Sequence, residues 1–315
     1  VRTTDEGFEN GAVMGRPLRV GVQLPEVERL VSWAELRDIA QAAEGVGFDS
    51  VWVGDHLLYR DDDTTTGPWE AWSLLAGLAE ATDRVRIGPL VAATAFHNPA
   101  MLAKKAATVD EMSGGRLILG LGAGWNQIEF DAYGFPFDRR ASRFGEAFTI
   151  IRTLLSEGRI DFRGEFYTLD DCELVPPARP GGPPLMIGSE GPRVLRMTLP
   201  YVDSWNAWYS WFRNTPHGAA ELMVTVDEAC ADVGRDPQEI ARTVAVFVEA
   251  PGSSGNVERV KRFEDPPALA GSPDEIAAGL AAFADVGISE VQLIVDPITV
   301  ESVTWLGQML SVLDA

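Results

Sequence analysis

The sequence is poor in several groups on which whole classes of protein depend. It has two cysteines in 315 residues, Cys172 and Cys230, which lie far apart and form no CxxC pair. A disulfide framework or a metal site is therefore not expected, and reduced thiols in a cytoplasmic protein are the plain interpretation. No stretch approaches the ~20 apolar residues that a membrane helix needs. We therefore expect no membrane anchor.

Positive charge is also scarce. Lysine and arginine together number 26 against 47 aspartates and glutamates, which gives a formal net charge of -21. Because nucleic acids and anionic membranes both require a basic surface, neither is expected as the main partner. The expected partner is a small-molecule substrate, and any anionic cofactor must be held by a local site that works against the overall field.

Several common catalytic motifs are missing as well. The chain has no HExxH, no GxSxG and no Walker loop, and its glycines at 120, 122 and 124 do not match the dinucleotide-binding fingerprint. Residues 1–17 are acidic and glycine-rich without an apolar centre. We expect this segment to be a flexible N-terminal tail, and neither a signal peptide nor an anchor.

Strand and helix patterns alternate from residue 18 to the end of the chain. Amphipathic stripes predict helices, whose starts carry capping residues: Ser32, Asn98 before a proline, and Ser272 before a proline. Asp236 before Pro237 shows the same pattern of a helix start. Apolar runs between these helices predict strands at residues 18–24, 50–53, 85–93, 117–121, 184–188, 203–208, 243–249 and 291–295.

Eight strands that alternate with helices predict an α/β fold with a parallel sheet covered by helices. A doubly wound sheet and a closed (β/α)8 TIM barrel both fit the alternation, although eight units in about 300 residues is the usual size of the barrel. We expect a single domain over residues 18–315. The Pro- and Gly-rich segments near 159–183 and 251–268 are expected to be loop inserts.

The active sites of such barrels form at the carboxyl ends of the strands. His56 follows the second expected strand, and its imidazole titrates near neutral pH, so it can donate or accept a proton. Asp55 beside it can orient the ring or accept a hydrogen bond from a cofactor. A solvated Asp-His loop explains the position equally well. His97, before the helix start at Asn98, is more often structural.

The turn Gly188-Ser189-Glu190-Gly191 lies between an expected strand and an expected helix. Small residues there let backbone amides approach a phosphate, and the start of a helix favours negative charge. Arg193 could add a cation. Glycine is also common in any turn of this kind, and Glu190 is unfavourable for a phosphate, so a helix cap is the alternative role for Glu190.

Tryptophans follow two of the expected strands. Trp205 and Trp208 lie in an aromatic segment, and Trp125 follows a glycine-rich strand end. Such residues suit a wall against a planar ring or an apolar substrate, which makes them candidates for a substrate pocket. Core packing is an equally good interpretation.

At these residues the sequence resembles the luciferase-like monooxygenase family, in particular its F420-dependent oxidoreductase branch. The block SGGRLILGLGAGW at residues 113–125 is highly specific for the family. The resemblance implies the (β/α)8 barrel rather than the doubly wound sheet. It is carried by SVWVGDHLL (50–58), the segment 86–126, PPLMIGSEGPRVLRM (183–197), YVDSWN (201–206) and the segment 270–293.

The resemblance also implies roles for individual residues. Asp55 and His56 match positions beside the cofactor ring, and His56 matches the position that handles protons in several members. The turn after Leu90 matches a place where members often have a non-prolyl cis peptide behind the ring. Residues 188–191 match the phosphate-binding turn, although relatives usually have Gly-Gly-x-Gly there. Deazaflavin-linked sugar-phosphate dehydrogenases have a catalytic glutamate where this chain has Trp125, so a sugar-phosphate substrate is not expected.

Three functions follow from these observations. The leading hypothesis is hydride transfer between the deazaflavin coenzyme F420 and a small organic substrate, with His56 moving the proton. The second is an FMN-dependent monooxygenase that uses molecular oxygen, which would employ the same residues. The third is a flavin-binding subunit without catalysis. The resemblance further implies a homodimer, and a separate reductase that supplies reduced F420 or FMN.

Overall fold

The computed structural model describes residues 15–61, 64–253 and 266–315. Within these ranges nine strands form one parallel sheet, in the order β5-β2-β1-β13-β12-β11-β10-β7-β6. The strands are β1 (Arg19–Gln23), β2 (Ser50–Val53), β5 (Arg86–Pro89), β6 (Ala92–Ala93), β7 (Leu119–Gly122), β10 (Leu185–Gly188), β11 (Ser204–Ala207), β12 (Ala241–Glu249) and β13 (Glu290–Asp296).

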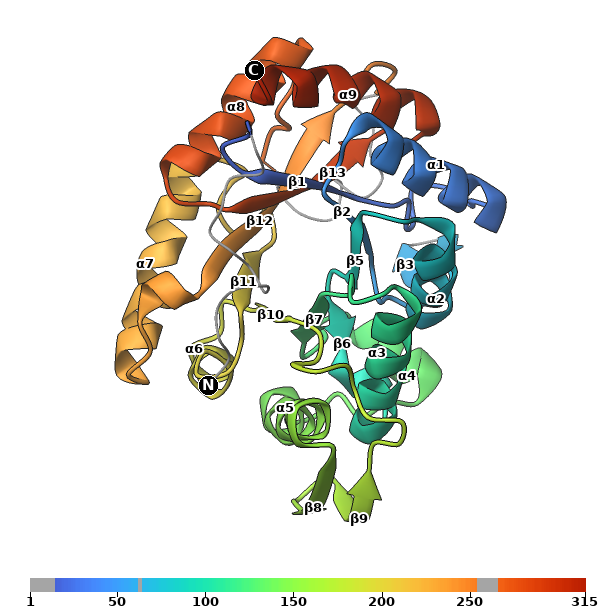
Figure 1. Ribbon diagram of the computed structural model, residues 1–315, viewed down its shortest axis with the longest axis vertical. Helices are drawn as coiled ribbons and strands as arrows, with labels where there is room; N and C mark the ends of the chain where they lie inside the picture. The colour runs from blue at the N-terminus through green and yellow to red at the C-terminus, as the bar shows by residue number, and fades with distance from the viewer. Residues whose placement is uncertain (1–14, 62–63, 254–265) are drawn as a thin grey trace.

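The sheet closes because β5 and β6 share one barrel position. Only two residues separate them; β5 pairs with β2 on one side, and β6 pairs with β7 on the other. A parallel bridge between Ile87 in β5 and Leu117, just before β7, connects the same barrel position to β7 a second time. The structure therefore confirms the (β/α)8 barrel with eight strand positions, ringed by helices in Figure 1.

Three helices begin where the capping patterns at Ser32, Asn98 and Ser272 predicted them. Ser32 accepts a hydrogen bond from the Glu35 amide, Asn98 caps a helix that starts with Pro99, and Ser272 forms a capping box with Glu275. None of the helices in the described ranges is both long and apolar enough to cross a bilayer. They are α1 (Trp33–Val46), α2 (Ala71–Ala81), α3 (Pro99–Met112), α4 (Gln127–Tyr133), α5 (Arg140–Glu157), α6 (Pro192–Thr198), α7 (Pro216–Asp232), α8 (Pro273–Asp285) and α9 (Val300–Leu313).

The helix start expected at Asp236 is wrong. Asp236 does accept a hydrogen bond from the Gln238 amide, but only a short 3-10 turn (Pro237–Glu239) follows. The β-branched and apolar run of β12 begins at Ala241, so the chain enters the sheet before a helix can form.

Two surface segments contain hairpins, one of them in a segment where a loop insert was expected. The insert near 159–183 holds strands β8 (Arg159–Arg163) and β9 (Thr168–Glu173), which project beyond α5 in Figure 1. Strands β3 (Tyr59–Asp61) and β4 (Thr64–Thr66) pair after β2. In the other expected insert, near 251–268, residues 254–265 lie outside the described residues.

The beginning of the chain corrects the expected boundary of the tail. Arg16 lies inside the range 1–17 that we expected to be flexible, yet its side chain is buried. It forms ion pairs with Asp49 at 3.0 Å and with Asp314 at 2.7 Å. Arg16 therefore ties the start of the barrel to its last helix, while residues 1–14 lie outside the described residues.

Candidate active site

His56 lies just past the carboxyl end of β2, and a buried carboxylate fixes its ring. The Nδ1 atom of His56 is 2.7 Å from Oε1 of Glu129, which lies on the short helix α4. The other oxygen of Glu129 accepts hydrogen bonds from the backbone amides of Leu57 and Leu58. The Glu129 side chain is 0% exposed, whereas the His56 side chain is 20% exposed. The Nδ1 edge of the His56 ring is thus fixed by a hydrogen bond, while part of the ring remains accessible to solvent.

A second carboxylate faces the other nitrogen of this ring. Oε1 of Glu26, in the loop after β1, is 4.0 Å from Nε2 of His56. Gln23 donates to Glu26 at 2.8 Å, and the Tyr59 hydroxyl donates to it at 3.2 Å. These two donors hold the buried Glu26 carboxylate beside the histidine.

The surrounding charges make His56 easier to protonate. Burial alone would lower its pKa, but the hydrogen bond to Glu129 and the negative charges of Glu26, Glu129 and Asp55 outweigh it. The pKa of His56 is therefore raised above its ordinary value of 6.5. At neutral pH this favours an imidazolium that can donate a proton.

Asp55 contacts His97 and does not orient the His56 ring, which was one of its two expected roles. Its carboxylate accepts a hydrogen bond from the Ala93 amide and pairs with Nε2 of His97, each at 2.9 Å. The group that orients the His56 ring is Glu129, while Asp55 ties the end of β2 to the segment after β6. His97 is held by this contact with Asp55.

The peptide bond between Leu90 and Val91 is cis, at the place that the family resemblance implied. The side chain of Val91 points at three glycines of the neighbouring strands. A β-carbon added at Gly120, Gly122 or Gly188 would lie 2.9, 2.7 or 3.1 Å from a Val91 methyl group. The glycines of β7 and β10 therefore provide the space that the Val91 side chain occupies.

The turn at 188–191 is held by the Ser189 side chain and by Trp205. The Ser189 hydroxyl accepts from the Gly191 amide at 3.1 Å, and the indole of Trp205 donates to the Ser189 carbonyl at 2.8 Å. Gly191 is the residue that caps α6, with no side-chain capping bond. The alternative that Glu190 caps the helix is therefore wrong; Glu190 is exposed, as is Arg193.

The three candidate tryptophans lie in different environments. Trp125 is 51% exposed, and its ring lies edge-on to His56 with centroids 5.6 Å apart. Trp205 is 0% exposed, so it supports the turn at 188–191 from the core instead of offering a surface to a substrate. Trp208 lies past the end of β11 and is half-buried. Its ring packs against Tyr209, with the ring centroids 4.9 Å apart. The structure thus brings Trp125, but not Trp205, to the histidine.

Glu26, Tyr59 and Glu129 were missed from the sequence. Glu129 had a local signal, because Asn126-x-x-Glu129 is typical of a helix start and α4 does begin there. Its carboxylate bonds to His56 rather than to the helix end, and that contact spans 73 residues. Glu26 had no signal beyond its place after a strand.

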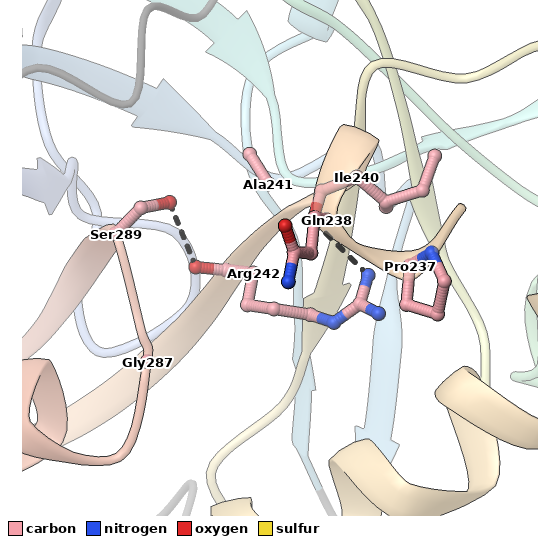
Figure 2. A pocket seen from close by; sticks show the side chains of 7 residues that line it. All are labelled: Pro237, Gln238, Ile240, Ala241, Arg242, Gly287 and Ser289. Carbon is pink, nitrogen blue, oxygen red and sulfur yellow. Dashed lines mark hydrogen bonds between the residues drawn. The ribbon is translucent and has the colours of Figure 1, made fainter.

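A cavity of about 310 Å³ lies at the opposite end of the barrel, where β12 and β13 begin (Figure 2). Two of its polar residues are engaged within the protein: Arg242 binds Asp227 at 2.6 Å and the Ile240 carbonyl at 3.1 Å, and Ser289 donates to the Arg242 carbonyl at 3.0 Å. The amino-terminal face of such barrels serves stability rather than catalysis. We therefore place the candidate active site around His56. The cavity is lined by Pro237, Gln238, Ile240, Ala241, Arg242, Gly287 and Ser289.

Comparison with known sequences yields several relatives. An F420-dependent glucose-6-phosphate dehydrogenase from Amycolatopsis mediterranei (strain U-32) is 38% identical over 168 residues, which are 51% of this chain and 49% of the relative. An enzyme of the same name from Intrasporangium calvum is 32% identical over 242 residues, 75% of this chain and 71% of the relative. A 5,10-methylenetetrahydromethanopterin reductase from Archaeoglobus fulgidus is 32% identical over 173 residues, 55% of this chain and 48% of the relative. The chain thus spans about half the length of the first and third of these relatives.

Solved structures share the fold at lower identity. An F420-dependent secondary alcohol dehydrogenase in complex with an F420-acetone adduct superimposes with a TM-score of 0.80 at 21% identity, covering 94% of this chain and 99% of that one. A monooxygenase from Streptomyces bottropensis superimposes with a TM-score of 0.75 at 19% identity, covering 93% of this chain and 99% of that one. The profile of the family described as luciferase-like monooxygenase matches residues 17–254. With this match over most of its length, the chain belongs to the luciferase-like monooxygenase family.

Proposed function

We propose that this protein is an oxidoreductase that transfers a hydride between coenzyme F420 and a small, uncharged organic substrate, with His56 moving the accompanying proton. The observation that carries the proposal is the position of His56: at the carboxyl end of a barrel strand, partly exposed, and flanked by the buried carboxylates of Glu26 and Glu129. Relatives named as F420-dependent enzymes support the choice of cofactor.

The proton and the hydride leave the substrate separately. When bound, the deazaflavin supplies the hydride chemistry by accepting or returning a hydride. In the oxidative direction His56 acts as a base and takes the proton from the substrate hydroxyl. In the reductive direction the raised pKa of His56 suits it to return that proton to the carbonyl oxygen.

Several residues at the barrel mouth fit a bound ring and phosphate. Oε1 of Gln23 is buried and has no hydrogen-bond partner within the described part of the chain, so it can accept from a donor on a bound molecule. We assign the ring to the space beside Asp55, His56 and the backbone at Leu90. We assign the phosphate to the backbone amides of residues 188–191, with Ser189 and Gly191 keeping the turn closed.

The charged side chains near the turn at 188–191 have opposite effects on a bound phosphate. Arg193 lies next to the turn and donates to Ser142 at 2.9 Å, so it contributes a cation close by. Glu190 is exposed in the middle of the turn and opposes an anion. Backbone amides do not depend on side-chain identity, and they are the main donors in this assignment.

The substrate that best fits the site is apolar or aromatic and carries no phosphate. Half of the Trp125 side chain is exposed beside His56 and offers an apolar surface. The carboxylates of Glu26, Asp55 and Glu129 disfavour an anionic substrate next to them. We further propose a cytoplasmic homodimer, with Trp208 lining the outer part of the pocket and a separate reductase that returns the cofactor to its reduced form.

An FMN-dependent monooxygenase is the second candidate. The family description names monooxygenases, and one structural neighbour, a riboflavin lyase with modified FMN, has a TM-score of 0.76 at 15% identity. The residues around His56 serve either cofactor. Cofactor preference therefore separates the two functions better than any single side chain does.

Side-by-side titration of the purified protein with coenzyme F420 and with FMN tests the proposal. We expect F420 to bind more tightly, measured by fluorescence quenching. FMN binding that equals or exceeds F420 binding would contradict the proposal and favour the monooxygenase.

A further inference from the structure

We propose that Glu129 is a positioning residue that assigns separate tasks to the two nitrogens of His56: Nδ1 is held by Glu129, and Nε2 exchanges the proton with the substrate. The inference rests on the proposed role of His56 in proton transfer. To that role it adds the ring nitrogen that exchanges the proton, Nε2, and the residue that selects this nitrogen, Glu129.

The contact to Nδ1 determines where the proton of the ring lies. A carboxylate has no hydrogen to donate, and Oε1 of Glu129 is 2.7 Å from Nδ1, so Nδ1 must carry the hydrogen. Neutral His56 is therefore the Nδ1–H tautomer, and its lone pair is on Nε2. The same hydrogen bond keeps the ring in one orientation, as the orienting partner of a catalytic histidine does.

The surroundings of Nε2 leave it available. Its nearest acidic atom, Oε1 of Glu26, is 4.0 Å away, which is too far for a hydrogen bond. Tyr59 flanks the ring at 4.8 Å between centroids, and Trp125 flanks it at 5.6 Å. Glu26 thus acts on Nε2 through its charge, while Glu129 occupies Nδ1 directly.

The ionisable groups around His56 come from four elements. Glu26 comes from the loop after β1, Asp55 from the end of β2, Tyr59 from β3, and Glu129 from α4. The three carboxylates favour the imidazolium, and Glu129 contributes both a charge and a hydrogen bond. Removal of Glu129 should therefore affect both the protonation and the tautomer of His56, whereas removal of the Glu26 charge should affect protonation alone.

The competing explanation is that Glu129 only pins residues 57 and 58 to α4. The Glu129→Gln substitution separates the two. The amides of Leu57 and Leu58 can only donate, so they retain the oxygen of the new side chain and turn its NH2 group toward Nδ1. Nδ1 then becomes an acceptor, and the ring hydrogen moves to Nε2.

The experiment is ¹⁵N NMR of the histidine ring nitrogens across a pH titration of the cofactor-free protein. The chain has three histidines, and spectra of His56→Ala and His217→Asn identify the His56 signals. We expect wild-type His56 to be the Nδ1–H tautomer, with a titration midpoint above the ordinary histidine value of 6.5. We expect Glu129→Gln to shift His56 to the Nε2–H tautomer and to lower its midpoint.

Glu26→Gln is the matched control. It removes one carboxylate charge near Nε2 and leaves the Nδ1 hydrogen bond in place, so we expect a lower midpoint with an unchanged tautomer. An Nε2–H tautomer in the wild-type protein overturns the inference without any variant. An unchanged tautomer in correctly folded Glu129→Gln, with folding checked by circular dichroism, also overturns it.

Kinetics of the F420-loaded enzyme provide a second readout. Glu129→Gln should lower kcat on the order of 10-fold to 100-fold, as does removal of outer groups that orient metal-bound histidines. KM should change little, and the pH profile should move with the midpoint. If the substitution impaired KM and kcat to the same extent and left the pH profile unchanged, Glu129 would have a purely structural role. Because the NMR measurement needs no cofactor, a failure of F420 binding would overturn the proposed function and leave the tautomer assigned by Glu129 standing.

Discussion

Gly54 and Glu26 lie so close together that Gly54 has no room for a side chain. A β-carbon on Gly54 would lie 2.5 Å from Cδ of Glu26 and 2.6 Å from its Oε1 atom. The absence of a side chain just before Asp55 and His56 therefore lets the carboxylate after β1 approach the histidine after β2.

Gly54→Ala should push the Glu26 carboxylate away from its donors, Gln23 and Tyr59. We expect a loss of about 1–3 kcal/mol in the free energy of unfolding, as in other overpacked sites, together with a lower pKa of His56. Denaturant unfolding and the NMR titration check these effects. Gly45→Ala is the matched control: Gly45 lies in α1 with open space around it, and alanine should stabilise the helix by about 0.5–1 kcal/mol. Equal effects of the two substitutions would refute the close contact.

Replacement of His56 should abolish most turnover. His56→Ala is expected to lower turnover by ~10²–10⁴-fold, the usual contribution of general acid–base catalysis. Cofactor affinity should change much less, because the backbone contacts assigned to the ring and phosphate remain. His56→Asn keeps polarity but cannot titrate, so the pH dependence near neutrality should disappear. An Asn variant within a few-fold of wild type, with the same pH profile, would show that His56 only shapes the pocket.

The raised pKa of His56 sets the direction of the pH dependence. Substrate oxidation needs the neutral ring, so its rate should rise as the pH passes upward through the raised pKa, above 6.5. Substrate reduction needs the imidazolium and should show the reverse trend. The same shift stabilises the fold fully below pH 6.5, and this contribution is lost as the pH rises through the folded-state pKa. Rate profiles in both directions test the sign; profiles that rise together would contradict it.

Asp110 is a buried carboxyl group, and its ionisation should lower the free energy of unfolding as the pH rises. Burial raises its pKa from 3.8 to about 6, against the opposing effects of Arg179 and the Leu117 amide, and its Oδ1 atom has no partner in the described residues. Because the folded-state pKa is the higher one, the protein loses stability as the pH rises from 3.8 to 6, and the full cost applies above pH 6.

Asp110→Asn should therefore stabilise the protein at pH 7.5, by on the order of 1–3 kcal/mol, and have little effect at pH 4. Thermal unfolding at the two pH values measures the difference. A variant that is less stable than wild type at pH 7.5 would show that the charge of Asp110 contributes more than its burial costs.

Glucose 6-phosphate should not be a substrate, although two relatives carry its name. Trp125 stands where the family resemblance places the catalytic glutamate of sugar-phosphate dehydrogenases, and three carboxylates surround His56. The decrease in F420 absorbance with glucose 6-phosphate should remain at background, whereas a panel of uncharged apolar alcohols should contain a substrate. Turnover of glucose 6-phosphate above that of every such alcohol would contradict this prediction.

The sequence by itself determined the features that depend on neighbours along the chain. Caps such as Ser32, Asn98 and Ser272 act on amides two or three residues away, so the pattern alone locates the helix starts. The alternation of apolar strands with helices indicated the parallel α/β architecture, and the specific block at residues 113–125 distinguished the barrel from the doubly wound sheet. Strand ends marked His56 as a candidate in the same way.

Only the tertiary structure decided which side chains meet at that histidine. Closure of the barrel brings together the ends of β1, β2 and β7, and so Glu26, His56 and Glu129, although the last two are 73 residues apart. The same packing buried Trp205 beneath the turn at 188–191 and drew residues after Asp236 into β12 instead of a helix. Contacts of this kind depend on where distant strands end in space, and hydrophobic periodicity, which reports only which face of an element is buried, carries no information about that position.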